Sequence, residues 1–178
     1  MATKIVIDYR RNDQRRYIYQ PYWITSGEID AEDFAVDESE CGLLFSFPAA
    51  KYGDSIILLH QCLMQVTEIF AGGTITVDVG SYTLALETVT TGGVMTIVDA
   101  DDFIPTADIT SGTAGAYWPA TGDFMTLKAA FTDGFPSVIT PADADVPAVG
   151  IYLTNDGASY TTGKGRVHML ISEVPLAA

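Results

Sequence analysis

The sequence has few basic residues, few histidines and few cysteines. Its 178 residues include 9 lysines and arginines, 2 histidines and 2 cysteines, against 23 aspartates and glutamates. Long helices usually carry many lysines, glutamates, glutamines and leucines on their exposed faces. Here lysine is scarce, while threonine, glycine, valine and tyrosine are common. The composition therefore indicates an all-β protein, and 48% hydrophobic residues exclude a disordered one.

The sequence also lacks the motifs of common enzyme classes. It contains no G-x-S-x-G, no H-E-x-x-H, no P-loop and no G-x-G-x-x-G. His60 and His168 each stand alone in a predicted strand, where a histidine is more often a packing or surface residue than a catalyst. We therefore expect a protein that is not an enzyme and that uses no cofactor.

Neither a disulfide framework nor a membrane span is indicated. Cys41 and Cys62 show no metal-site spacing, so two reduced thiols are the favoured interpretation, with a single disulfide left open. The longest apolar run, Ile56 to Val66, is too short and too polar to cross a membrane. The N-terminus has no apolar signal-like region. The sequence thus predicts assembly in a cytoplasm, without membrane contact.

Positive charge is concentrated at the N-terminus. Residues 1–20 carry a net charge of +3, and residues 21–178 carry −17. A body of that sign repels phosphate, so we expect no nucleic-acid partner. Arginine next to tyrosine is typical of protein interfaces, and the favoured interpretation is an arm that docks onto another protein or another copy. Its docking residues would be Arg10, Arg11, Arg15, Arg16, Tyr17, Tyr19, Tyr22 and Trp23.

Short strand patterns separated by turns run from residue 43 to the C-terminus. Residues 55–70 are the one place where a helix could form, but their β-branched content favours a long strand, in which a bulge is possible. Gly80-Ser81 predicts a turn. Residues 99–122 are rich in Gly, Thr, Asp and Pro and predict a long surface loop. About eight to ten strands at this spacing indicate a β-sandwich or jelly roll.

Three parts of the chain are expected. Residues 1–24 form an N-terminal arm, and residues 43–178 form the β-sandwich domain. Between them, residues 25–42 form an acidic loop or one short helix, for which Asp30 is a candidate N-cap.

The predicted loop at 99–122 holds two weaker candidate sites. Tyr117 and Trp118 could contact a partner or stack on a sugar ring, or could fold back onto the sandwich. Asp99, Asp101 and Asp102 could supply oxygen ligands to Ca²⁺, but the ligand order of an EF-hand is missing, so a solvated loop is favoured and no metal is expected.

Four stretches resemble small structural proteins of tailed-bacteriophage virions, in particular head decoration or cement proteins. They are Tyr22-Trp23-Ile24 leading into residues 27–33, the T-x-x-V-D-V-G-like strand at 73–80, Asp101-Asp102-Phe103-Ile104, and residues 162–167. This resemblance implies a β-sandwich that binds the outer surface of a capsid, with no catalytic residues.

The same resemblance implies the partners. They would be the major capsid protein and further copies of this chain in a homotrimer, located on the virion surface. The basic first twenty residues and the 99–122 segment depart from simple cement proteins. Two alternatives stay open: a receptor- or carbohydrate-binding tail adhesin module, and a tail or connector subunit.

Overall fold

The computed structural model describes residues 20–34, 41–85, 95–110, 117–118, 137–142, 144–156 and 160–175, and this part of the chain is nearly all β. Its elements in chain order are β1 (Tyr22–Thr25), β2 (Ile29–Asp30), the 3-10 helix η1 (Ala31–Asp33), β3 (Cys41–Ser46), α1 (Ala49–Tyr52), β4 (Ser55–Ala71), β5 (Ile75–Leu84), β6 (Met95–Asp108), β7 (Tyr117–Trp118), β8 (Ser137–Ile139), β9 (Val146–Asn155) and β10 (Thr162–Pro175). The all-β class expected from the composition is confirmed.

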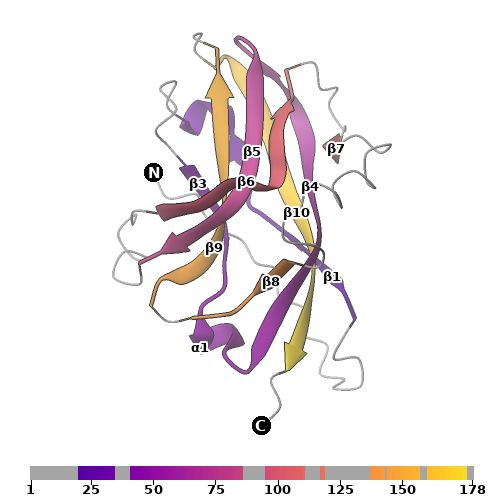
Figure 1. Ribbon diagram of the computed structural model, residues 1–178. Helices are drawn as coiled ribbons and strands as arrows, with labels where there is room; N and C mark the ends of the chain where they lie inside the picture. Colours follow the sequence, from indigo (N-terminus) through magenta and orange to yellow (C-terminus); the bar gives the residue numbers. More distant parts are fainter. Residues whose placement is uncertain are drawn as a thin grey trace.

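The strands form two antiparallel sheets (Figure 1). In the six-stranded sheet the neighbours run β1-β10-β4-β7, while β2 also pairs with β10 and β8 also pairs with β4. In the four-stranded sheet they run β3-β9-β5-β6. Figure 1 shows β10 passing behind β5 and β6, so the two sheets lie over one another.

One hydrophobic core is built from both sheets. Alternate side chains of β4 and β10 face those of β5 and β9, as a period of two residues requires. Each fully buried aliphatic side chain contributes about 1.5–3 kcal/mol by leaving water. The core includes Ile57, Leu59, Cys62, Met64, Val66 and Phe70 of β4, Val167, Met169 and Ile171 of β10, Ile75, Val77 and Val79 of β5, and Val149, Ile151 and Leu153 of β9.

The long strand predicted at residues 55–70 is confirmed as β4. It pairs with β10 almost end to end, and the register shifts between Leu170 and Ile171 of β10. At that point β4 places His60 and Gln61 consecutively outside the core. This is the behaviour of a β-bulge, which adds one residue to a strand without ending it.

Two loop and turn predictions are wrong. Gly80-Ser81 is not a turn, because β5 continues through it to Leu84. Residues 99–108 are not a loop, because they belong to β6 and pair with β5. Gly80 explains both errors. A Cβ there would overlap the backbone carbonyls of Asp99 and Ala100, so the glycine lets the two strands approach closely.

The acidic segment after β1 contains the short helix that the sequence left open. Asp30 caps η1, and its carboxylate accepts a hydrogen bond from the backbone N–H of Glu32 at 3.1 Å. Cys41 and Cys62 are both free thiols, so they form no disulfide. The described residues contain no helix of the length and hydrophobicity needed to cross a membrane.

Candidate interaction surfaces

Exposed large hydrophobic side chains gather at the edges of the two sheets. Among the described residues, Trp23 of β1 is 47% exposed, Ile97 and Val98 of β6 are 59% and 64% exposed, and Val138 of β8 is 56% exposed. These strands lie at sheet edges, and only Ile69, in β4, lies elsewhere. Soluble proteins normally protect their edges with charge, proline or coverage. Exposed apolar residues at edges are therefore candidate positions for contact with a partner.

The end of the predicted docking arm is fixed on the six-stranded sheet. β1 pairs with β10, which sets Trp23 opposite Leu170. Ile24 is buried in the core and Tyr22 packs against it, while the Tyr22 hydroxyl donates a hydrogen bond to Glu173. Because side chains alternate along a strand, Trp23 points away from the core. The other predicted docking residues, Arg10, Arg11, Arg15, Arg16, Tyr17 and Tyr19, lie outside the described residues.

A polar ladder crosses the outer face of the same sheet. The Thr25 hydroxyl lies 2.9 Å from Nδ1 of His168, and Nε2 of His168 lies 3.2 Å from Oε1 of Gln65. This geometry fits a neutral imidazole that accepts at Nδ1 and donates at Nε2. Burial, and then the charge of Arg166, lowers the pKa of His168. The ladder therefore links β1, β10 and β4 through a neutral histidine.

His60 and Ser172 form a second cross-strand pair. Nε2 of His60 lies 2.6 Å from the Ser172 hydroxyl, and burial lowers the pKa of His60. A serine beside a histidine is also the geometry of an activated nucleophile. Here, however, Ser172 is only 2% exposed, which leaves no room for a substrate carbonyl at its hydroxyl. The pair joins β4 to β10. The sequence did not reveal this contact, because His60 and Ser172 are 112 residues apart in the chain.

Three candidate metal ligands lie on a strand, not in the loop predicted for them. Asp99, Asp101 and Asp102 all belong to β6. A side-chain hydrogen bond with Asp99 raises the pKa of Asp101, and slight burial and the Asp99 charge add to the effect. Within the described residues, no group of three or more histidine, cysteine or acidic side chains is placed to hold a metal ion.

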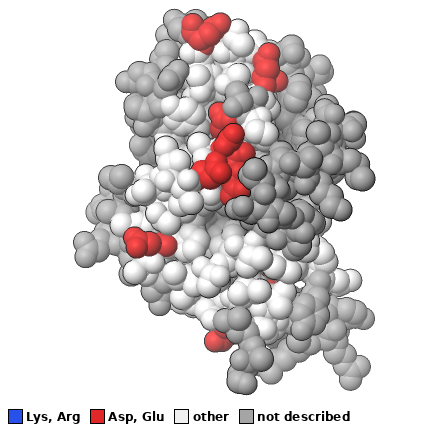
Figure 2. Space-filling model, in the orientation of Figure 1, with Lys and Arg blue, Asp and Glu red and all other residues white. Residues whose placement is uncertain are grey.

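Acidic side chains gather on one face of the molecule. Figure 2 shows Asp and Glu side chains gathered near its centre, over the region of β6, with no lysine or arginine among the coloured atoms. Asp78 on β5 is close enough for its charge to raise the pKa of Asp101 further. This acidic face is formed by the four-stranded sheet.

Two basic residues of β10 are already paired within the chain. Nζ of Lys164 lies 3.3 Å from Asp30 and 3.9 Å from Glu28, and the Arg166 guanidinium lies 3.9 Å from Glu28. Exposed pairs of this kind contribute about 0–1 kcal/mol each. These pairs offset the positive charge of Lys164 and Arg166 at this end of the sheet.

The aromatic pair of the predicted loop forms a short strand. β7 pairs with β4, which sets Trp118 opposite Met64 and Tyr117 opposite Gln65. The pair thus extends the sheet on the side opposite β1. Tyr117 and Trp118 are therefore placed at a sheet edge, as Trp23 is.

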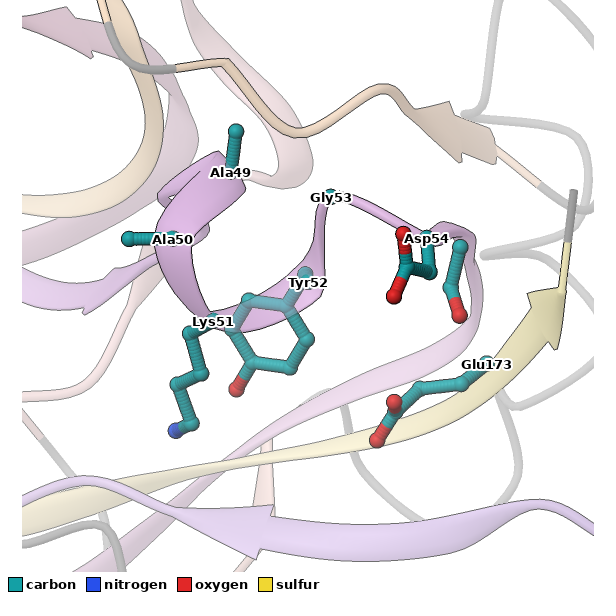
Figure 3. Close-up of a pocket in the computed structure, with 8 residues that line it drawn as sticks. Ala49, Ala50, Lys51, Tyr52, Gly53, Asp54 and Glu173 are labelled. Atoms are coloured by element: carbon teal, nitrogen blue, oxygen red, sulfur yellow. The ribbon is translucent and has the colours of Figure 1, made fainter.

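A small hollow lies beside α1 (Figure 3). It has a volume of about 190 Å³ and is lined by α1 and residues 53–55 together with Glu173 of β10. Burial lowers the pKa of Lys51, partly offset by the charge of Glu173, and its ammonium lies 4.7 Å from the centroid of the Tyr52 ring. Pockets for small molecules usually measure about 300–1,000 Å³. This hollow is therefore a weaker candidate site than the exposed sheet edges.

Comparison with known proteins adds no family. No family model, curated protein or solved structure matches this chain.

Proposed function

We propose that this protein is a non-enzymatic structural protein of a tailed-bacteriophage virion, which binds the outer surface of the capsid and stabilises it by bridging neighbouring capsid subunits. Its partners would be the major capsid protein and other copies of itself, in a homotrimer. The observation that carries the proposal is the order in which the strands pair.

The strand pairing supports a jelly-roll β-sandwich. β1 and β2 act as one strand, because both pair with β10, and β7 and β8 act as another, because both pair with β4. Counted in this way, the chain has eight strands among its described residues. The first (β1 with β2) pairs with the eighth (β10), and the second (β3) pairs with the seventh (β9). The third (β4) pairs with the sixth (β7 with β8), and the fourth (β5) pairs with the fifth (β6). Such nesting is a long antiparallel hairpin rolled into two sheets, which is the jelly roll of viral capsid and lectin domains.

The exposed surface of the protein also supports the proposal, because it offers an acidic face and apolar side chains at the sheet edges. The acidic face of the four-stranded sheet keeps a particle soluble when it points outward. The exposed apolar residues Trp23, Ile97, Val98 and Val138 suit contact with neighbouring subunits. A contact of standard size, about 1,600 Å² in total, adds stability to a shell that binds the protein.

A carbohydrate-binding tail module is the second candidate. It is favoured by the exposure of Trp23, since a flat, half-exposed aromatic ring can stack on a sugar. Lectin domains also use jelly rolls, so the fold alone does not separate the two functions.

Co-sedimentation with capsid shells tests the proposal. The shells would be assembled from a tailed-bacteriophage major capsid protein, and a glycan array would be run on the same preparation. We expect saturable binding to shells, a higher temperature of shell disruption and no glycan signal. Glycan binding that Trp23→Ala abolishes, without shell binding, would establish the second candidate instead.

A further inference from the structure

We propose that Gly73, Asn155 and Asp156 form a binding site for one hard cation, Ca²⁺, at the end of the sandwich where β9 ends and β5 begins. We call these three residues the Asn155 site. The inference is independent of any contact with a capsid, and so goes beyond the proposed function.

The side chain of Asn155 is buried without hydrogen bonds. Asn155 is the last residue of β9 and is only 4% exposed. Neither its Oδ1 nor its Nδ2 has a hydrogen-bond partner among the described residues. Burying an amide in this state is unfavourable. Most buried polar side chains in folded proteins have a partner, and an orphaned one often marks a bound water or ion. The amide of Asn155 therefore points to a small bound group.

Gly73 leaves room for that group. A Cβ on Gly73 would lie 2.1 Å from Oδ1 of Asn155 and 2.8 Å from Oδ1 of Asp156. Two side-chain oxygens therefore converge on the same face of Gly73, at a position that the side chain of any other residue would fill. The turn that contains Gly73 joins β4 of the six-stranded sheet to β5 of the four-stranded sheet.

Asp156 gives the Asn155 site a negative charge. Its Oδ1 accepts a hydrogen bond from the backbone N–H of Thr74 at 3.0 Å. Hydrogen bonds with Thr74 lower the pKa of Asp156, so its carboxylate is ionised at neutral pH. No lysine or arginine is among the groups that shift this pKa. A carboxylate has about four lone-pair sites, so Asp156 can hold Thr74 and still bind a cation.

The chemistry of the two oxygens selects Ca²⁺. Carboxylate and amide oxygens are its usual protein ligands, and it accepts about six to eight oxygens, water included, in flexible geometry. Water alone would satisfy the amide but would leave the charge of Asp156 uncompensated. With one acidic side chain, the Asn155 site differs from clusters of three or more acidic, histidine or cysteine side chains, which the described part of the chain does not contain.

A cation at the Asn155 site would join the two sheets at this end of the molecule. The backbone N–H of Asp156 already donates to the carbonyl of Thr74 at 3.2 Å, so β9 and the start of β5 are held together before the cation binds. Only two protein side chains would contact the cation. We therefore expect a weak site, with a dissociation constant of about 10⁻⁴–10⁻³ M, as in extracellular Ca²⁺ modules.

Thermal unfolding of the full chain tests the site. The protein would be freed of metal with a chelator and titrated with CaCl₂ to ~10 mM, well above the expected dissociation constant. Asp156→Asn removes the charge, and Asn155→Asp adds a second carboxylate at the same position. The matched control, Asp54→Asn, changes the net charge equally at an exposed position outside the site. NaCl at equal ionic strength measures general screening, and calorimetric titration gives the affinities.

We expect CaCl₂ to raise the melting temperature of the wild type and of Asp54→Asn by about 3–10 °C, and NaCl to raise it less. Asp156→Asn should lose most of this rise. Asn155→Asp should bind Ca²⁺ at least about tenfold more tightly, because affinity increases with the number of charged ligands. Without Ca²⁺ the same variant should be less stable than the wild type, since two carboxylates then face each other.

Three results would overturn the inference. They are the absence of a Ca²⁺-dependent rise in the wild type, an equal rise in Asp156→Asn, and an Asn155→Asp protein that binds Ca²⁺ no more tightly than the wild type. If Asn155→Asp is unfolded without metal, circular dichroism during the CaCl₂ titration gives the answer: folding on addition of Ca²⁺ supports the site, and a chain that stays unfolded contradicts it.

Discussion

Replacing Gly80 by alanine tests the close crossing of β5 and β6. In an ordinary strand interior, glycine to alanine stabilises by about 0.5–1 kcal/mol because the backbone loses less entropy on folding. Here the added methyl group would overlap the carbonyl groups of Asp99 and Ala100. These atoms belong to the backbone and cannot rotate away, so β6 itself has to move.

The magnitude follows from these two opposing effects. Overpacking that forces a backbone shift costs about 1–3 kcal/mol, which exceeds the entropic gain. We therefore expect Gly80→Ala to lower the free energy of unfolding by about 1–2 kcal/mol, and the melting temperature by about 2–8 °C for a chain of this length.

Urea unfolding followed by circular dichroism measures the change. The matched control is Ser81→Ala, next to Gly80 on the same strand, for which we expect a change within about 0.5 kcal/mol. A Gly80→Ala protein as stable as wild type, or more stable, would refute the close approach of β6 to β5 at this position.

Two further predictions concern titratable groups. Burial raises the pKa of Cys41 to about 11 and raises the pKa of fully buried Cys62 still further. A disulfide-exchange reagent at mildly alkaline pH should therefore modify both thiols slowly in the native protein and rapidly after denaturation. Fast reaction of Cys62 in the native protein would contradict its place in the core. Burial lowers the pKa of His60 and His168 in the folded state. Below a pH of about 6.5 the unfolded chain therefore binds protons that the folded chain does not. The free energy of unfolding should fall as the pH is lowered, by at most about 1.4 kcal/mol per pH unit for each histidine. His60→Gln and His168→Gln should each reduce this slope in urea titrations between pH 7 and pH 5, and unchanged slopes would show that neither imidazole is held neutral by the fold.

The sequence by itself determined the fold class and the polarity of charge. Alternating side chains in β5 and the apolar content of β4 follow directly from the periodicity of a strand. The free thiols agree with the favoured interpretation of two unpaired cysteines. Asp30 was a candidate cap, because short polar side chains satisfy backbone N–H groups at a helix start, and it caps η1 in the structure. Each of these properties depends on neighbours within a few residues.

Only the tertiary structure decided how the strands pair and which residues meet. Gly80 looked like a turn, because local propensity cannot reveal that a distant backbone passes over a glycine. His60 and Ser172 are 112 residues apart in the sequence and are brought together by the pairing of β4 with β10. The exposure of Ile97 and Val98 likewise depends on which strand ends the sheet. Strand pairing is a long-range property, so the nested order of the strands appears only when the chain is folded.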